Sequence, residues 1–162
     1  MGRRSVRENK NEYQLAREEA GLTRSEAAEL MEYVSESRIE KIESEKSLPH
    51  PDEIIAMSSA YRKPSLCNFY CSNKCPLGQN VPSVESKDLS QITLEMLATL
   101  NSLNREKDRM IEITADGQIS DDEMEDFSRI RKQLKQISMI VDSLQLWIDN
   151  KVVAGKIDPS KL

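Results

Sequence analysis

Three cysteines and the single histidine of this chain are the residues whose types and spacing best suit a metal. Cys67, Cys71 and Cys75 follow one another at intervals of four residues, and His50 stands earlier between two prolines. Thiolates held near one point repel one another unless a cation neutralises them. The pattern therefore predicts a Cys3His zinc site or a three-thiolate iron–sulfur cluster. The alternative is that the cysteines fill a buried helix face as small hydrophobic residues.

The segment that carries these cysteines is expected to be a short helix followed by a turn. A helix would place Cys67 and Cys71 on one face, one turn apart. Asn73 is suited to end that helix, and a proline and a glycine then indicate a turn around Cys75. This cysteine-containing connector and its linker are predicted to span residues 66–86.

Residues 15–61 contain short runs of apolar residues at helical spacing, each closed by a cap or a breaker. Gly21 ends the first run, and Thr23 with Glu26 three residues later forms a capping box for the next. Ser35 is suited to cap the third run. Helices this short are unstable alone in water, so they must pack against one another.

One residue pattern runs through this stretch. Its members are Leu15, Arg17, Gly21, Leu22, Thr23, Ala28, Met31, Ser35, Ile39, Ile42, Glu43, Pro49, Ile54, Ile55 and Met57. The pattern resembles the phage-repressor-like (XRE) helix-turn-helix family, and the stretch through the cysteines resembles an extension found in regulators of anaerobic Firmicutes. The resemblance implies an all-α, five-helix domain over residues 11–65. It also implies a partly buried ion pair between Arg17 and Glu43.

The resemblance further implies that this domain reads DNA. Its third helix would lie in the major groove, where Arg38 could read a guanine and Ser37 and Lys41 would make further contacts. Arg24, at the start of the second helix, would hold a phosphate. The predicted function is therefore a sequence-specific transcriptional regulator that binds double-stranded DNA as a dimer.

Two features of the sequence depart from the family pattern. The turn at residues 32–35 lacks the glycine that the family usually places there. The third helix also carries Glu36, Glu40, Glu43 and Glu45, and carboxylates repel phosphate. The alternative function is an adaptor that keeps the helix-turn-helix scaffold for packing and binds a protein partner without DNA, with or without the metal or iron–sulfur site.

Residues 87–154 are predicted to form a long antiparallel helical hairpin. Apolar residues recur at alternating spacings of three and four over residues 87–114 and 120–153, and Gly117 breaks the chain between them. A two-helix hairpin cannot enclose a core alone, whereas two copies make a four-helix bundle. The hairpin is therefore expected to hold a homodimer, and residues 155–162 are expected to be a tail.

Charge is distributed without a strongly basic segment. The net charge of the chain is −5, so nonspecific coating of nucleic acid is not expected. The exception is a basic N-terminal arm at residues 1–10, with Arg3, Arg4, Arg7 and Lys10. This arm either follows a DNA backbone or is a solvated tail.

Catalytic and targeting signals are not found in the sequence. With one histidine and no Gly-rich phosphate loop, no triad or nucleotide-binding motif can be assembled, so the chain is not expected to be an enzyme. No apolar run resembles a signal peptide or is long enough to span a bilayer. The protein is therefore expected to be cytoplasmic, without contact to a membrane.

Overall fold

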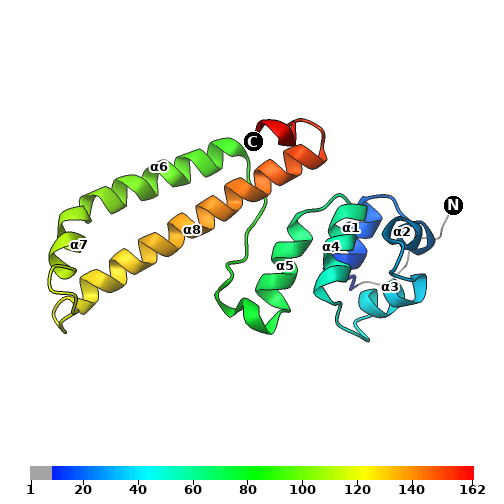
Figure 1. Ribbon diagram of the computed structural model, residues 1–162, viewed down its shortest axis with the longest axis horizontal. Helices are drawn as coiled ribbons and strands as arrows, with labels where there is room; N and C mark the ends of the chain where they lie inside the picture. The colour runs from blue at the N-terminus through cyan, green and yellow to red at the C-terminus, as the bar shows by residue number, and fades with distance from the viewer. Residues whose placement is uncertain (1–8) are drawn as a thin grey trace. The chain divides into compact units, whose positions relative to one another are not determined.

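The computed structural model describes residues 9–162, and over that range the chain is built from α-helices and short 3-10 helices, without a strand (Figure 1). The predicted all-α class is therefore confirmed. The chain divides into two compact units, residues 1–83 with 148–162 and residues 84–147. The first unit contains α1 (Glu12–Glu19), α2 (Arg24–Met31), α3 (Glu36–Glu43), α4 (Pro51–Ala60), α5 (Ser65–Asn73) and the 3-10 helices η1 (Pro76–Asn80) and η2 (Pro159–Lys161). The second contains α6 (Leu89–Arg105), α7 (Lys107–Ile113) and most of α8 (Met124–Val153).

The helix ends of the first unit follow from local capping. Gly21 has a φ of +74° just after α1, where a side chain would be strained. At the start of α2 the Glu26 N–H donates to the Thr23 hydroxyl at 3.2 Å, and the Thr23 N–H donates to the Glu26 carboxylate at 2.7 Å. The Ser35 hydroxyl accepts from the Arg38 N–H at the start of α3. These three predicted signals are confirmed.

The core of the first unit draws on its five α-helices α1 to α5. Its buried members are Tyr13, Ala16, Ala27, Met31, Val34, Ile39, Ile42, Ile54, Met57, Tyr61 and Leu66. The fifth helix lies at Ser65–Asn73, whereas five helices were expected before residue 66. Leu66 is fully buried, and the Phe69 ring meets the Tyr13 ring edge-on at 5.8 Å. The expected connector therefore begins with a helix that completes this core.

After α5 the chain folds back along that helix. Asn73 ends α5 as predicted, and the Cys75 N–H donates to the Tyr70 carbonyl at 3.0 Å. Gly78 lies so close to the Cys71 backbone that a Cβ would stand 1.6 Å from the carbonyl oxygen. The Asn68 side chain donates to the Pro82 carbonyl at 3.0 Å. These contacts hold residues 75–82 against α5.

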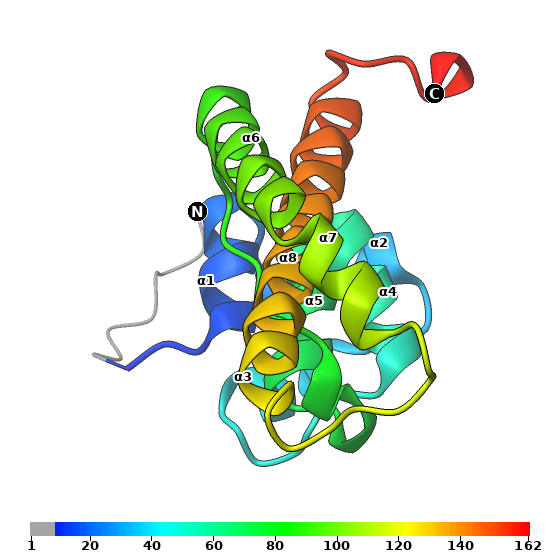
Figure 2. The ribbon, with the colours of Figure 1, turned by 90° about the vertical axis from the view of Figure 1, so that its left-hand side faces the viewer.

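In the second unit, α6 and α7 lie beside α8 in both views (Figures 1 and 2). Gln133 of α8 donates to the Ser102 hydroxyl at 2.9 Å, which sets the antiparallel register. The first predicted helix, 87–114, is interrupted at Glu106. There Nε and Nη2 of Arg129 in α8 donate to the two oxygens of the Glu106 carboxylate. α8 begins at Met124 rather than at residue 120, because Ser120 caps a preceding turn through the Glu123 carboxylate.

Candidate nucleic-acid interface

One side of α3 is buried and the other is open to solvent. Ile39 and Ile42 belong to the core, whereas Ser37 and Lys41 are exposed. The Ser35 hydroxyl caps the first turn of α3, so the helix begins at Glu36. This arrangement places two of the four predicted DNA contacts, Ser37 and Lys41, on one exposed helix side.

A buried ion pair joins α1 to α3. Arg17 Nε and Nη2 donate to the two oxygens of Glu43 at 2.5 and 2.9 Å, and the side chains are 8% and 1% exposed. Arg17 Nη1 also donates to the Leu22 carbonyl at 2.6 Å. Burial acts to lower the pKa of Arg17, but the hydrogen bond and charge of Glu43 outweigh it and raise that pKa. The predicted Arg17–Glu43 pair is confirmed.

Arg24 is the second arginine at this carboxylate. Its Nε donates to Glu43 Oε2 at 2.8 Å, and 32% of its side chain is exposed. Arg24 lies at the start of α2 and about a third of its side chain is open to solvent, so it is placed where a phosphate contact is possible. Glu43, counted among the acidic residues of α3 in the sequence, is buried between two arginines and does not contribute an exposed carboxylate.

Arg38 is engaged in a network that joins α3 to the start of α4. Its Nε and Nη2 donate to the Glu53 carboxylate at 2.6 and 2.7 Å. Nη1 donates to the Ser47 hydroxyl at 2.5 Å, and Nη2 also reaches the Leu48 carbonyl at 2.9 Å. Glu53 was not among the predicted site residues, although it stands at the third position of a helix that begins with a proline, where a carboxylate can cap.

Electrostatics in this network favour both charged forms. The hydrogen bond from Arg38 is the main cause that lowers the pKa of Glu53, and the His50 N–H adds to it at 2.7 Å. The same hydrogen bond raises the pKa of Arg38. A base contact by Arg38 would require these bonds to be exchanged, so the geometry suits Arg38 to positioning α3.

The turn between α2 and α3 is tight and contains no glycine. Glu32 has a φ of +57°, and the Tyr33 N–H donates to the Met31 carbonyl at 2.6 Å, which closes a γ-turn. Val34 enters the core, and the exposed Tyr33 ring is anchored by its hydroxyl, which donates to the Asp52 carbonyl at 2.8 Å. Glu32 therefore takes a conformation that favours glycine, at the turn where the family pattern has one.

The predicted basic arm falls mostly outside the described residues, because Arg3, Arg4 and Arg7 precede residue 9. Lys10 is described, and its ammonium pairs with the Glu18 carboxylate at 2.6 Å.

The predicted metal ligands lie in two places. His50 is exposed at the start of α4, and its backbone N–H donates to the Glu53 carboxylate. Cys67, Cys71 and Cys75 are half-buried free thiols, and burial is the main cause that raises the pKa of Cys71. Within residues 9–162, no group of three or more His, Cys, Asp or Glu side chains is arranged to hold a metal. As arranged here these residues do not fit zinc or a cluster. The site stays a prediction, which elemental analysis of protein purified without oxygen would decide.

No helix within residues 9–162 is both long and apolar enough to cross a membrane. Comparison with protein families finds a match to a helix-turn-helix model over residues 14–65. Comparisons with curated proteins and with solved structures find no match. The matched residues begin in α1, contain α2, α3 and α4 entire and end where α5 begins, and they include the Arg17–Glu43 pair. Residues 14–65 are therefore a helix-turn-helix domain of the XRE type, a DNA-binding class of domain.

Proposed function

We propose that this protein is a sequence-specific regulator of transcription that binds double-stranded DNA as a dimer, with α3 in the major groove. The observation that carries the proposal is the way α3 is held. The Arg17–Glu43 pair ties it to α1 and the Arg38–Glu53 network ties it to α4, while Ser37 and Lys41 stay exposed. A helix held in a defined position with exposed polar side chains is what base reading requires.

Each group has a distinct role in this proposal. Ser37 and Lys41 contact base edges or nearby phosphates, and Arg24 contacts a phosphate beside the start of α2. Glu36 and Glu40, exposed beside them, repel phosphate and can accept a hydrogen bond from a cytosine amino group. Affinity therefore rests on few cations, and we expect binding to weaken only shallowly as salt rises, with a salt slope of about one per phosphate contact.

The test begins with selection of genomic fragments by the purified protein at low and moderate salt. A selected fragment is then titrated with the wild type and with Lys41→Ala across a salt series. The variant is expected to bind roughly 5- to 100-fold more weakly, with the salt slope reduced by about one if the lysine meets a phosphate. Lys132→Ala on α8 is the matched control, because it removes an exposed lysine far along the sequence from α3. A protein that enriches no sequence, or a Lys41→Ala variant that binds like the control, would contradict the proposal.

The second candidate is the protein-interaction adaptor. The observation in its favour is that Glu36 and Glu40 are exposed on α3 and no ion pair is seen for either of them among the described residues. An acidic helix side of this kind complements a basic partner. Pull-down from a native lysate distinguishes the two functions. A stoichiometric protein partner that survives nuclease treatment and is lost in Glu36→Lys with Glu40→Lys would favour the adaptor.

A further inference from the structure

The second unit contains a small pocket between α7 and the first turns of α8, with a volume of about 100 Å³. Its most deeply buried lining residues are Ile113 of α7 and Ile130 of α8, each 1% exposed. Met110 and Leu134, which also line it, are 37% and 43% exposed. The pocket therefore runs from the interior of the hairpin to its surface.

The interior of this pocket offers no polar group to an occupant. Apart from Thr114 and Arg131, its lining side chains are aliphatic, aromatic or thioether. The Thr114 hydroxyl donates to the Met110 carbonyl at 2.8 Å, within the last turn of α7, so it is already bonded. A polar group buried here without a partner would cost free energy. The part of a ligand that enters the pocket must therefore be apolar.

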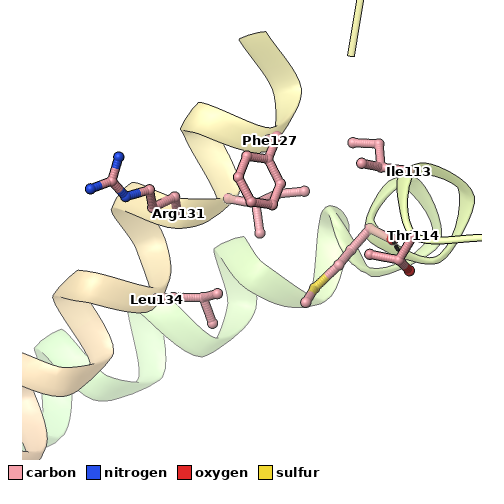
Figure 3. Close-up of a pocket in the computed structure, with 7 residues that line it drawn as sticks. Ile113, Thr114, Phe127, Arg131 and Leu134 are labelled. Atoms are coloured by element: carbon pink, nitrogen blue, oxygen red, sulfur yellow. Dashed lines mark hydrogen bonds between the residues drawn. The ribbon is translucent and has the colours of Figure 1, made fainter. Parts of the chain in front are cut away.

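Arg131 is the one charged residue among those that line the pocket. It stands on α8 four residues after Phe127 and three before Leu134, so it shares their side of the helix. Figure 3 shows its guanidinium directed away from Ile113, while its stem lies on the side of Leu134. Arginine commonly lays its stem along apolar surface and keeps its charge in water. The positive charge therefore stands outside the apolar interior.

The arginines beside the pocket differ in whether they have a partner. Arg109 of α7 binds Asp126 at 2.6 Å, and Arg129 of α8 binds Glu106 at 3.0 Å and Asp126 at 2.6 Å. No ion pair is seen for the exposed Arg131 within residues 9–162. The carboxylates of Asp126 and Glu106 are thus already bound to other arginines, and the guanidinium of Arg131 is left for an anion from solution.

The size of the pocket and its single cation together limit the ligand. A cavity of about 150 Å³ lined by similar side chains holds benzene, so this smaller one suits a chain of about four or five carbons. One guanidinium can donate two parallel hydrogen bonds to one carboxylate. A single cation also balances a single negative charge. These features together describe a short aliphatic chain that ends in a carboxylate.

We propose that the pocket between α7 and α8 binds a short-chain fatty acid of about five or six carbons. Its chain lies against Ile113 and Ile130, and its carboxylate stays at the surface. The guanidinium of Arg131 reaches that carboxylate by rotation of its stem, which no ion pair holds. This site goes beyond the DNA-binding proposal, because it gives the hairpin a ligand of its own.

The methyl group of Met110 reports on the pocket directly. The full chain, labelled with ¹³C at the methyl groups of its seven methionines, is titrated with 4-methylpentanoate and followed by NMR. The Met110 signal, identified by its loss in Met110→Leu, is expected to shift with half-saturation on the order of 1 mM. The signals of Met31 and Met57, in the core of the first unit, are expected to stay in place. A Met110 signal that does not move by about 20 mM overturns the proposal.

Two further compounds test the two parts of the ligand. Acetate keeps the charge but lacks the chain, and each missing buried methylene weakens binding about fourfold, so acetate is expected not to shift Met110 at the same concentrations. The alcohol 4-methylpentan-1-ol keeps the chain without the charge, and it is expected to bind about fivefold more weakly. An alcohol that binds as tightly as the acid overturns the assignment to a carboxylate.

Two pairs of variants test the residues. Arg131→Gln is expected to weaken 4-methylpentanoate about fivefold, whereas its neighbour Lys132→Gln, which removes an exposed charge that does not line the pocket, should bind like the wild type. Leu134→Phe adds bulk at the pocket and should abolish the shift, whereas Leu97→Phe on α6 should not.

Circular dichroism of these variants separates lost binding from lost structure. All four residues are exposed, so the helix content is expected to match the wild type. Because no DNA is present in these experiments, their outcome does not depend on the DNA-binding proposal. An Arg131→Gln variant that binds 4-methylpentanoate like the wild type overturns the role of the guanidinium, and a Leu134→Phe variant that does so overturns the pocket as the site.

Discussion

Two arginine–glutamate forks of the same geometry stand in the two units of this protein. In the first unit Arg17 holds Glu43 through Nε and Nη2, and in the second Arg129 holds Glu106 through the same two nitrogens. The first pair is 8% and 1% exposed, whereas the second is 46% and 21% exposed. An exposed fork competes with water and salt, so its loss changes little, but a buried charge that loses its partner is costly.

The contrast extends to the apolar side chains. The first unit closes a core from α1 to α5, and two ion pairs tie α3 to α1 and to the start of α4. The second unit buries one side of a hairpin and leaves large apolar side chains exposed, among them Leu97, Leu100 and Leu134. The first unit therefore fixes the position of α3, whereas the second leaves large apolar side chains in solvent.

The largest expected effect tests the buried fork. Glu43→Gln leaves two arginines beside a neutral side chain, and we expect it to lower the free energy of unfolding of the first unit by about 3–5 kcal/mol. All four tyrosines lie in that unit and the single tryptophan lies in the second. Urea unfolding followed by near-ultraviolet dichroism of tyrosine and by Trp147 fluorescence therefore reports the two units separately.

Glu106→Gln is the matched control for this comparison. It removes the carboxylate of the exposed fork, and the midpoint of the Trp147 transition is expected to stay where it is in the wild type. Equal losses in the two variants would show that burial does not distinguish the two forks.

A smaller effect is expected at the Arg38–Glu53 network. Glu53→Gln should cost roughly 1.5–3 kcal/mol near neutral pH, as charged hydrogen bonds do. The pKa of Glu53 is lowered in the fold, chiefly by Arg38. Its stabilising contribution is therefore complete above the unfolded value of about 4.3 and is lost as the pH falls through the lower folded value. Urea midpoints measured from neutral pH down to about pH 3 should converge for wild type and variant. A constant gap would assign the loss to packing.

The smallest expected change in stability comes from the turns before α3 and before α8. Glu32 and Gly117 both have positive φ, at +57° and +72°, in the connections before α3 and before α8. Glu32→Gly removes the strain of a side chain there and is expected to stabilise the first unit by about 0.5–1 kcal/mol. Gly117→Ala, whose Cβ would meet no atom within 4 Å, should destabilise the hairpin by about 1 kcal/mol through backbone strain alone. Thermal unfolding that moves both variants in the same direction would contradict this reading of the turns.

The features that the sequence predicted well are those set within a few residues. The Thr23–Glu26 capping box, the Ser35 cap and the end of α5 at Asn73 each depend on neighbours along the chain. The helical spacing of apolar residues likewise identified the core of α3 and the two arms of the hairpin. The Arg17–Glu43 pair was foreseen for another reason, because the residue pattern resembled a known family.

What the tertiary structure alone decided concerns partners distant in sequence. Arg38 looked like a free cation on α3, but Glu53 of α4 holds it, and Glu43 looked like a surface carboxylate until Arg17 and Arg24 enclosed it. The sequence shows which residues of the hairpin are apolar. Only the packing of α6 against α8, in the register that the Ser102–Gln133 bond sets, decides which of them stay exposed. A side chain's charge and size are written in the sequence, but its neutralisation and burial depend on which helix packs against it.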